Sequence, residues 1–384
     1  MDFDFNEEQL LLKDTARKFA EGTLAATQED DEEHHRFRPE HAKAMAELGF
    51  FGIIIKEEYG GTAMGHLASS IVSEEIARVS ASWGVQINMQ MNGPGYIIQT
   101  FGTEDQKKKY IPRLVSGDAF GCFAITEANT GSDVASMKTT AKKTSDGWLL
   151  NGSKMWISNG HIADIGIVYA CTDKEAKHKG LSAFIVDMKK TKGIESKAIE
   201  SKFGLFCAPT SELYFEDALI PENAILGKPG EGFKICMTML DCTRLSSAAR
   251  AVGISQACLD ASVKYALERM QFGKPIAEYQ MIQQQIAQMR VEHEAARLLV
   301  YQAAAKKDKG QSNTLEVSMA KFFGAEAAVY AANTAMKIHG SYGYSNEYPV
   351  GRYLRDAKSL QVVEGTSNIQ NMIISSFALG KRTS

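Results

Sequence analysis

Hydrophobic residues near the start of the chain recur at helical spacing, and the first of them are Leu10, Leu11, Ala16, Phe19 and Ala20. They follow Asn6, a residue type that caps helices, and the acidic pair Glu7 and Glu8, which suits a first helical turn. Three further stretches have the same character, at 39–48, 67–79 and 103–115. The pattern predicts a helical domain over residues 1–120.

The pattern changes near residue 120, where short β-prone runs separated by polar turns replace the helical spacing. These runs lie at 148–150, 166–169, 181–186 and 213–215. The dipeptide Asn151-Gly152 is a strong signal for a two-residue hairpin turn. We therefore predict a β domain over residues 121–232.

From about Phe233 to the end, helical spacing returns in longer stretches. Helices are predicted over 233–270, 280–307, 314–339 and after Ser367. Small residues between Ser246 and Ala257 suit close contact between helices. The chain is therefore expected to be an α+β protein whose third domain, over residues 233–384, is helical.

Composition and charge exclude several classes of protein. The chain has 384 residues, of which 44% are hydrophobic and 23% charged, as in ordinary globular proteins. Lys and Arg total 43 against 46 Asp and Glu, a net charge of −3, so a nucleic-acid-coating protein is excluded. No apolar run approaches the ~18 residues of a membrane span, and the acidic start does not resemble a secretory leader.

The cysteines and histidines indicate neither a disulfide framework nor a metal site. Six cysteines are scattered without a CxxC pair, which predicts buried thiols in a reducing compartment, the cytoplasm. Eight histidines show no HExxH spacing. The pair His34 and His35 follows an acidic run, and this favours a solvated face over a metal site.

Five short strings combine small residues, hydroxyls and a lone acid in ways that suit a flat cofactor. In chain order they are 123–127 with 131–133, 154–160, 269–275, 338–344 and 362–368. Trp156 beside Ser158 can stack on a ring and bond to its edge, and Arg269 is a natural partner for a diphosphate. Glu364, between an apolar pair and a glycine, can be a base with a raised pKa.

Each string also has an ordinary structural explanation. The first can be a helix-to-strand turn, Trp156 can belong to the core, and Glu364 can be an exposed carboxylate. Arg269 can simply complement the dipole of its helix. The string 338–344 lacks the GxGxxG spacing and does not follow a predicted strand, so a Rossmann site is excluded. Only the occurrence of all five strings together favours a cofactor site.

In this order and spacing, the strings resemble the acyl-CoA dehydrogenase family of flavoenzymes, over essentially the whole chain. FAITEANTGSD is similar to the family's first signature, CxAxTEPxxGSD, and IHGSYGYSNEYPVGRYLRD to its second. Further family elements match RMQFGKPI, KMWISNG, GTEDQKKKYIP and VVEGTSNIQ.

The resemblance implies a fold and an assembly. The family has an N-terminal helical domain, a central β-barrel-like domain and a C-terminal four-helix bundle, usually in a homotetramer. FAD lies between the β domain and the bundle, and a neighbouring subunit completes its site. The α–β–α order read from the hydrophobic pattern agrees with this expectation.

The resemblance also implies roles for individual residues. Expected FAD contacts are Phe123, Ile125, Thr126, Trp156, Ser158, Arg269, Gln271, Phe272, Gln280, Gln283, Lys337, Gly340, Ser341, Thr366 and Asn368. Expected contacts with the acyl-CoA are Ser132, Asp241, Arg244 and Gly365, with Trp83 shaping the acyl pocket. Glu364 falls on the catalytic base. Some family branches place the base just before the residue matching Arg244, but Thr243 occupies that position here.

The implied reaction is α,β-dehydrogenation of an acyl-CoA to the 2,3-enoyl-CoA, with electrons passed to electron-transfer flavoprotein. The thioester carbonyl is expected to accept from the Glu364 backbone N–H, while the Glu364 carboxylate takes the α-proton. Alternatives are an enoyl-CoA reductase working in the reverse direction, an acyl-CoA oxidase, and a silent homologue that only binds CoA esters or a partner. Typical oxidases have longer chains than this one.

The chain departs from the family pattern at several positions. Ala128 and Lys56 replace prolines, and Lys337 replaces a glutamine, so the contact of Lys337 is open. The flanking sequence resembles the glutaryl-CoA and cyclic acyl-CoA branch, but Gly84 stands where glutaryl-CoA dehydrogenases have an Arg for the distal carboxylate. A carboxylate buried without its cation is costly, so an uncharged acyl group is expected, such as cyclohexanecarboxyl or a short branched chain, with glutaryl-CoA as the alternative.

Overall fold

The first helix, α1 (Glu7–Phe19), begins where its polar residues predict. The Asn6 side chain accepts from the Gln9 backbone N–H at 2.8 Å, and the Gln9 side chain accepts from the Asn6 N–H at 3.1 Å. This reciprocal capping box satisfies two N–H groups that would otherwise lack partners. The structure, a computed structural model, describes residues 4–381.

The first domain is built of short helices. After α1 and a π-helical turn at Ala20–Leu24 come α2 (Gln28–Glu33), α3 (Pro39–Glu47), α4 (Gly65–Val79) and α5 (Ala81–Ile87). A second π-helical segment, η3 (Asn88–Gly95), leads into α6 (Tyr96–Phe101) and α7 (Glu104–Val115). The helices predicted at 39–48, 67–79 and 103–115 are confirmed.

The central domain is one twisted sheet. Its strands are β1 (Gly121–Ala124), β2 (Thr140–Thr144), β3 (Gly147–Ser158), β4 (Ile165–Cys171), β5 (Leu181–Asp187), β6 (Ile194–Ala198), β7 (Thr210–Ile220) and β8 (Ile225–Leu226). They run in the order β6-β7-β3-β2-β4-β5-β8, and β1 pairs with β4. β4 is buried along its whole length, because β1 lies parallel on one side and β5 antiparallel on the other.

The hairpin predicted at Asn151-Gly152 is wrong. β3 continues through this dipeptide, and the turn between β2 and β3 lies at 144–147 instead. Gly152 has φ 138°, and the register with β7 shifts between Leu150 and Gly152, which marks a β-bulge. A Cβ atom on Gly152 would lie 2.7 Å from Thr139 Cα. The glycine is therefore required by the close passage of another chain segment, not by a turn.

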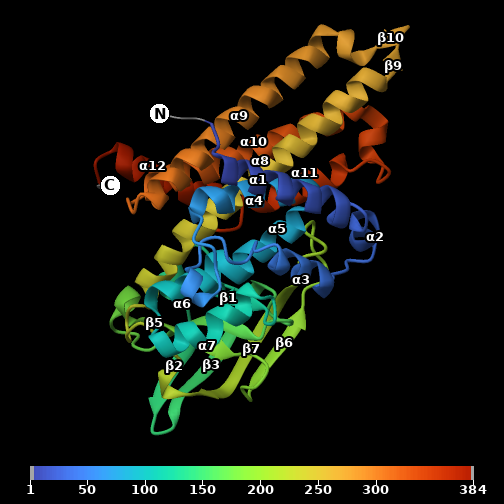
Figure 1. Cartoon of the computed structure of the whole chain (residues 1–384). Coiled ribbons are helices and arrows are strands. Elements are labelled where there is room, and N and C mark those ends of the chain that lie inside the picture. Colours follow the sequence, from blue (N-terminus) through green and yellow to red (C-terminus); the bar gives the residue numbers. More distant parts are fainter. Residues whose placement is uncertain (1–3, 382–384) are drawn as a thin grey trace.

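The third domain consists of long helices. They are α8 (Gly232–Glu268), α9 (Gln280–Asp308), α10 (Thr314–His339), α11 (Val350–Leu360) and α12 (Ser367–Ala378). In Figure 1, α8 runs from beside the sheet to the far tip of the bundle, where the short strands β9 (Met270–Gln271) and β10 (Lys274–Pro275) form a projecting hairpin. The α+β fold class is thus confirmed.

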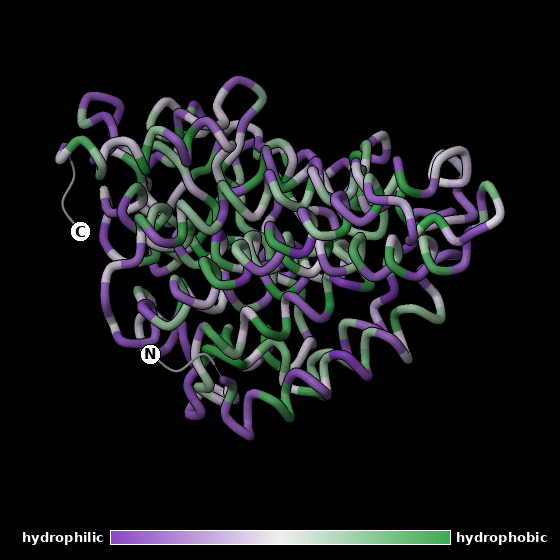
Figure 2. Tube along the Cα trace, turned by 90° about the horizontal axis from the view of Figure 1, so that it is seen from above, coloured by the Kyte–Doolittle hydropathy of each residue, from purple (hydrophilic) through white to green (hydrophobic). Residues whose placement is uncertain are grey.

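Small residues let α4 approach α8 closely, as the run in α8 predicted. A Cβ atom on Gly253 of α8 would lie 2.3 Å from the Glu74 carbonyl oxygen of α4. Figure 2 shows hydrophilic segments along much of the periphery of the fold and apolar segments gathered inside it. Within residues 4–381, no helix is long and apolar enough to cross a membrane.

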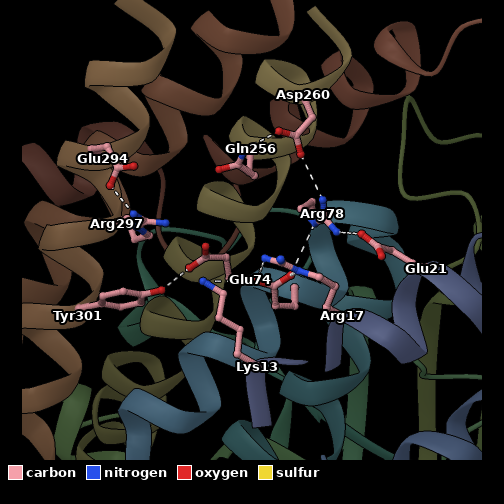
Figure 3. A network of polar contacts seen from close by, with 11 residues as sticks. Lys13, Arg17, Glu21, Glu74, Arg78, Gln256, Asp260, Glu294, Arg297 and Tyr301 are labelled. Atoms are coloured by element: carbon pink, nitrogen blue, oxygen red, sulfur yellow. Dashed lines mark hydrogen bonds and ion pairs between the residues drawn. The ribbon is translucent and has the colours of Figure 1, made fainter. Parts of the chain in front are cut away.

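A network of charged residues joins the N-terminal helices to the bundle (Figure 3). Glu75 on α4, which is 2% exposed, accepts two hydrogen bonds of 3.0 Å from Arg17 on α1. Its neighbour Glu74 accepts from the Tyr301 hydroxyl of α9 at 2.6 Å. Arg78 pairs with Asp260 of α8 at 3.2 Å and also with Glu21. These contacts hold α4 in the middle of the molecule, between α1, α8 and α9.

Replacing Arg17 by Met should lower the free energy of unfolding by about 2 kcal/mol, because Glu75 stays buried and loses its bidentate partner. Lys13 and Arg78, each 3.6 Å from Glu75, offset part of the loss. The matched control is Lys18→Met on the same helix, which breaks an exposed pair with Asp14 and should cost less than ~0.5 kcal/mol. Urea unfolding measures both, and equal losses would contradict a structural role for the Arg17–Glu75 pair.

Candidate active site

Glu364 lies in the loop between α11 and α12, and buried cations hold this loop by its backbone. Its carbonyl oxygen accepts from Arg244 Nε at 3.1 Å and from Gln370 Nε2 at 3.3 Å. The next carbonyl, of Gly365, accepts from Lys321 Nζ at 2.7 Å. Glu364 has φ 56°, an uncommon value for a residue with a side chain, so the loop is held in a strained conformation of the kind found at functional sites.

The Glu364 carboxylate is partly satisfied by two neighbours. Thr243 Oγ1 of α8 donates to Oε2 at 2.6 Å, and Asn88 Nδ2 of η3 lies 3.5 Å from Oε1. Burial raises the pKa of Glu364, and the Thr243 hydrogen bond and the charges of Arg250, Arg244 and Lys321 act against that rise. A carboxylate whose pKa is raised in this way is suited to act as a general base.

Asp241 and Arg244 lie together on the same helix. The Arg244 guanidinium donates to Asp241 Oδ1 at 3.0 Å, and the Thr314 hydroxyl donates to Oδ2 at 2.8 Å. Arg244 is 4% exposed, and its other donor goes to the Glu364 loop. The structure therefore brings together four of the predicted residues: Asp241, Arg244, Glu364 and Gly365.

A second group of predicted residues lies at the ends of β1 and β3. The Met155 N–H donates to the Thr126 carbonyl oxygen at 2.9 Å, so Thr126 lies beside Trp156. Lys154 Nζ donates to the Ile125 carbonyl oxygen at 3.0 Å and pairs with Glu127 at 2.9 Å. The predicted residues gathered here are Phe123, Ile125, Thr126, Trp156 and Ser158.

Lys154 and Glu127 position this edge, a role that sequence reasoning missed. Lys154 is 1% exposed, and burial lowers its pKa to about 8 although the Glu127 charge raises it. The Glu127 carboxylate also accepts from the backbone N–H groups of Lys138 and Thr139. The sequence does hold a signal for this pair, because Glu127 and Lys154 are each a single charged residue within one of the strings predicted to contact the cofactor.

The two groups are joined through η3. A Cβ atom on Gly93 would lie 2.7 Å from a ring carbon of Phe123, so this π-helical segment packs directly on β1. Asn88, at the start of the same segment, reaches the Glu364 carboxylate. The same segment therefore contacts both Glu364 and the strand that carries Phe123.

A third group of predicted residues lies far from Glu364 along the chain, around the projecting hairpin. Arg269 lies over the Tyr342 ring with 5.5 Å between guanidinium carbon and centroid, next to the exposed Gly340 and Ser341. Phe272 is 94% exposed at the tip. Among residues 4–381, no hydrogen bond or ring contact joins these residues to the Phe123–Trp156 edge. The remaining predicted FAD contacts in this part, Gln271, Gln280, Gln283 and Lys337, are also exposed.

The other predicted residues are placed as follows. Thr366 caps α12 by accepting from the Ile369 N–H at 3.3 Å, and Asn368 and Ser132 are exposed. Trp83 is 2% exposed and stacks on Phe37 in the N-terminal domain, 5.0 Å between ring centroids. Its predicted part in the acyl pocket stays a prediction.

The residues at the sheet edge and the tip fit a flat, phosphate-bearing cofactor such as FAD. Trp156 is 55% exposed on a bulged strand at φ 63°, which leaves a ring face open to stacking. At the tip, Gly340 has φ 60° and no atom within 4 Å of the position of a Cβ, so a ligand can approach its backbone closely. Arg269 stands beside it as a cation for a diphosphate.

Comparison with known proteins gives matches along the whole chain. Three family models match: "Acyl-CoA dehydrogenase, N-terminal domain" over 6–118, "middle domain" over 122–218 and "C-terminal domain" over 230–379. Glutaryl-CoA dehydrogenase of Desulfococcus multivorans is 50% identical, covering 100% of this chain and 99% of that protein.

Two further matches bear on the reaction. The acryloyl-CoA reductase (NADH) of Anaerotignum propionicum is 42% identical, over 97% of this chain and 95% of that protein. Among solved structures, a glutaryl-CoA dehydrogenase in complex with glutaryl-CoA superposes with a TM-score of 0.98 at 49% identity, covering 100% of this chain and 98% of that one.

Proposed function

The chain belongs to the acyl-CoA dehydrogenase family of FAD-dependent oxidoreductases, and we propose that Glu364 is the base with which it dehydrogenates an acyl-CoA thioester between the α- and β-carbons. The observation that carries this proposal is the half-buried Glu364 carboxylate, which accepts from Thr243 and lies within 3.5 Å of Asn88 on η3, the segment that also packs on Phe123. FAD, when bound, supplies the acceptor for the β-hydride.

The strained Glu364 loop prepares both steps that the protein itself performs. Among the described residues, no group accepts from the Glu364 backbone N–H, so this N–H is free to donate to a thioester carbonyl and stabilise the enolate that develops there. The side chain of the same residue takes the α-proton, and its raised pKa favours that transfer. Arg244 and Lys321 fix this residue by binding its own carbonyl oxygen and that of Gly365.

The proposal extends to partners and setting. Electrons would pass from the reduced enzyme to electron-transfer flavoprotein. A homotetramer is proposed because Arg269, Gln271 and Phe272 project away from the Glu364 region, where a second copy can receive them. The six cysteines are all unpaired and buried, which favours a cytoplasmic setting.

A second candidate function is reduction of an enoyl-CoA by the same residues in the reverse direction. The 42% identical acryloyl-CoA reductase favours it. In that direction, protonated Glu364 would return its proton to the α-carbon. For the acyl group itself, the missing side chain at Gly84 favours an uncharged group such as cyclohexanecarboxyl, whereas the 50% identical relative is a glutaryl-CoA dehydrogenase.

Glu364→Gln should retain FAD and lose the substrate-driven bleaching of the flavin band by a factor of about 10²–10⁴, because the amide cannot accept the α-proton. The measurement is an anaerobic visible titration with butyryl-, cyclohexanecarboxyl- and glutaryl-CoA. The matched control is Glu347→Gln at an exposed glutamate, which should bleach like the unmodified enzyme. Rapid bleaching of Glu364→Gln would place the base elsewhere.

Thr243→Val should move the acidic limb of the kcat/KM profile to higher pH by about one unit. The Thr243 hydroxyl lowers the pKa of Glu364, so its loss raises that pKa further, and the base is then ionised only at higher pH. Thr238→Val is the control, because the Thr238 hydroxyl bonds only to the Lys234 carbonyl oxygen of its own helix. An unchanged acidic limb would show that the limb does not report Glu364.

A further inference from the structure

Arg250, in the middle of α8, is a buried cation without a protein partner. The residue is 3% exposed, and its Nε is buried without a hydrogen bond. Among the described residues, none forms a hydrogen bond or an ion pair with any nitrogen of this guanidinium. Burying an unpaired ion is among the most costly things a fold can do, so the arrangement requires an explanation.

Arg250 lies on the same face of α8 as the residue that holds the base. Thr243 and Arg250 are seven residues apart, which is two helical turns and about 10 Å along the axis. Helical side chains lean toward the N-terminal end, so the guanidinium is carried back toward Thr243 and Glu364. In the turn between them, the buried hydroxyls of Ser246 and Ser247 also lack partners.

Gly84 is what allows Arg250 to occupy this place. A Cβ atom on Gly84 would lie 2.8 Å from Arg250 Cδ and 3.0 Å from Cγ, so α5 passes directly over the methylene groups of Arg250. A side chain at position 84 and an arginine at position 250 therefore compete for one space. Because position 84 on α5 is a glycine, the cation in this region comes from Arg250 on α8.

The other buried cations around Glu364 have partners. Arg244 pairs with Asp241 and binds the Glu364 carbonyl oxygen, and Lys321 binds the Gly365 carbonyl oxygen. Burial lowers the pKa of Arg250 to about 10, so the side chain remains charged at neutral pH. The negative charge of Glu364 acts against this lowering and favours the charged form of Arg250. That charge disappears whenever Glu364 takes up a proton. A second anion is then needed beside Arg250.

We propose that Arg250 binds a carboxylate at the far end of the acyl group, so that the substrates are short ω-carboxyacyl-CoA thioesters. This inference rests on the proposed function. It replaces the uncharged acyl group expected from Gly84, because that expectation looked for the cation only at position 84.

The test compares two thioesters of equal length, glutaryl-CoA and pentanoyl-CoA, in anaerobic flavin bleaching. The wild-type enzyme should prefer glutaryl-CoA in kcat/KM by at least about 10-fold. Arg250→Gln should lose about 30–100-fold with glutaryl-CoA and change far less with pentanoyl-CoA, because the substrate carboxylate loses a charged partner. Arg250→Lys keeps the charge but loses the planar guanidinium. Its kcat/KM with glutaryl-CoA should therefore lie between the values of the wild type and of Arg250→Gln.

Binding without turnover gives a second measurement. In the Glu364→Gln background, calorimetric titration should show glutaryl-CoA binding weakened by a similar factor when Arg250→Gln is added, with pentanoyl-CoA little affected. Gly84→Ala addresses the case in which Arg250→Gln does not fold. Its added methyl group displaces Arg250 and should lower the glutaryl-CoA preference by about 10-fold or more while FAD content is kept.

The outcomes separate this inference from the proposed function. A wild-type enzyme that bleaches faster with pentanoyl- or cyclohexanecarboxyl-CoA would overturn the carboxylate site and leave the dehydrogenase intact. Equal losses with both thioesters in Arg250→Gln and Arg250→Lys would assign Arg250 a general structural role and overturn it as well. A flavin band that no thioester bleaches would remove the proposed function together with the inference.

Discussion

The site depends on keeping the Glu364 carboxylate largely away from water and still able to ionise. Glu364 loses hydration, which favours its neutral form, and the surrounding charges partly restore the ionised form. The charges come from Arg244 and Arg250 on α8 and from Lys321 on α10, and Thr243 on α8 adds a hydrogen bond. Because α8 and α10 are long and pack closely on each other, the groups around the carboxylate are held by rigid elements rather than by loops.

A second constraint is that the helical side and the sheet side of the site must keep their spacing. Polar side chains buried at this boundary do so. Gln90 of η3 accepts from the Gly121 N–H at 2.7 Å and donates to the carbonyl oxygens of Leu114 in α7 and Ala119 in the loop before β1. Gln86 of α5 and Asn159 exchange two hydrogen bonds of 3.0 and 2.9 Å. These bonds fix α5 and η3 on the sheet, and through them Gly84 and Asn88 beside the base.

The sequence predicted the features that depend on the local residue pattern. It did not reveal the features that depend on contacts with segments distant along the chain. The helices at 280–307 and 314–339 follow from apolar spacing alone, and the structure ends them within one residue of the prediction. Gly152 was predicted to lie in a turn, because the neighbouring residues do not reveal that the Thr139 backbone packs directly against it. Arg250 was missed in the same way, since it sits in a run of small residues that suggested only close helix packing.

The contrast between two sets of buried charges explains why Arg250 is best understood through a ligand. Glu75 pairs with Arg17, and Arg78 pairs with Glu21 and Asp260 (Figure 3), so the loss of hydration is offset by ion pairs that form on folding. Arg250 is buried to a similar extent as Glu75, but no residue in the described part of the chain forms a hydrogen bond or an ion pair with it. The charge of Glu364 favours the ionised form of Arg250, but it is lost when Glu364 takes up a proton, and the proposed carboxylate of the acyl group then supplies the missing negative charge.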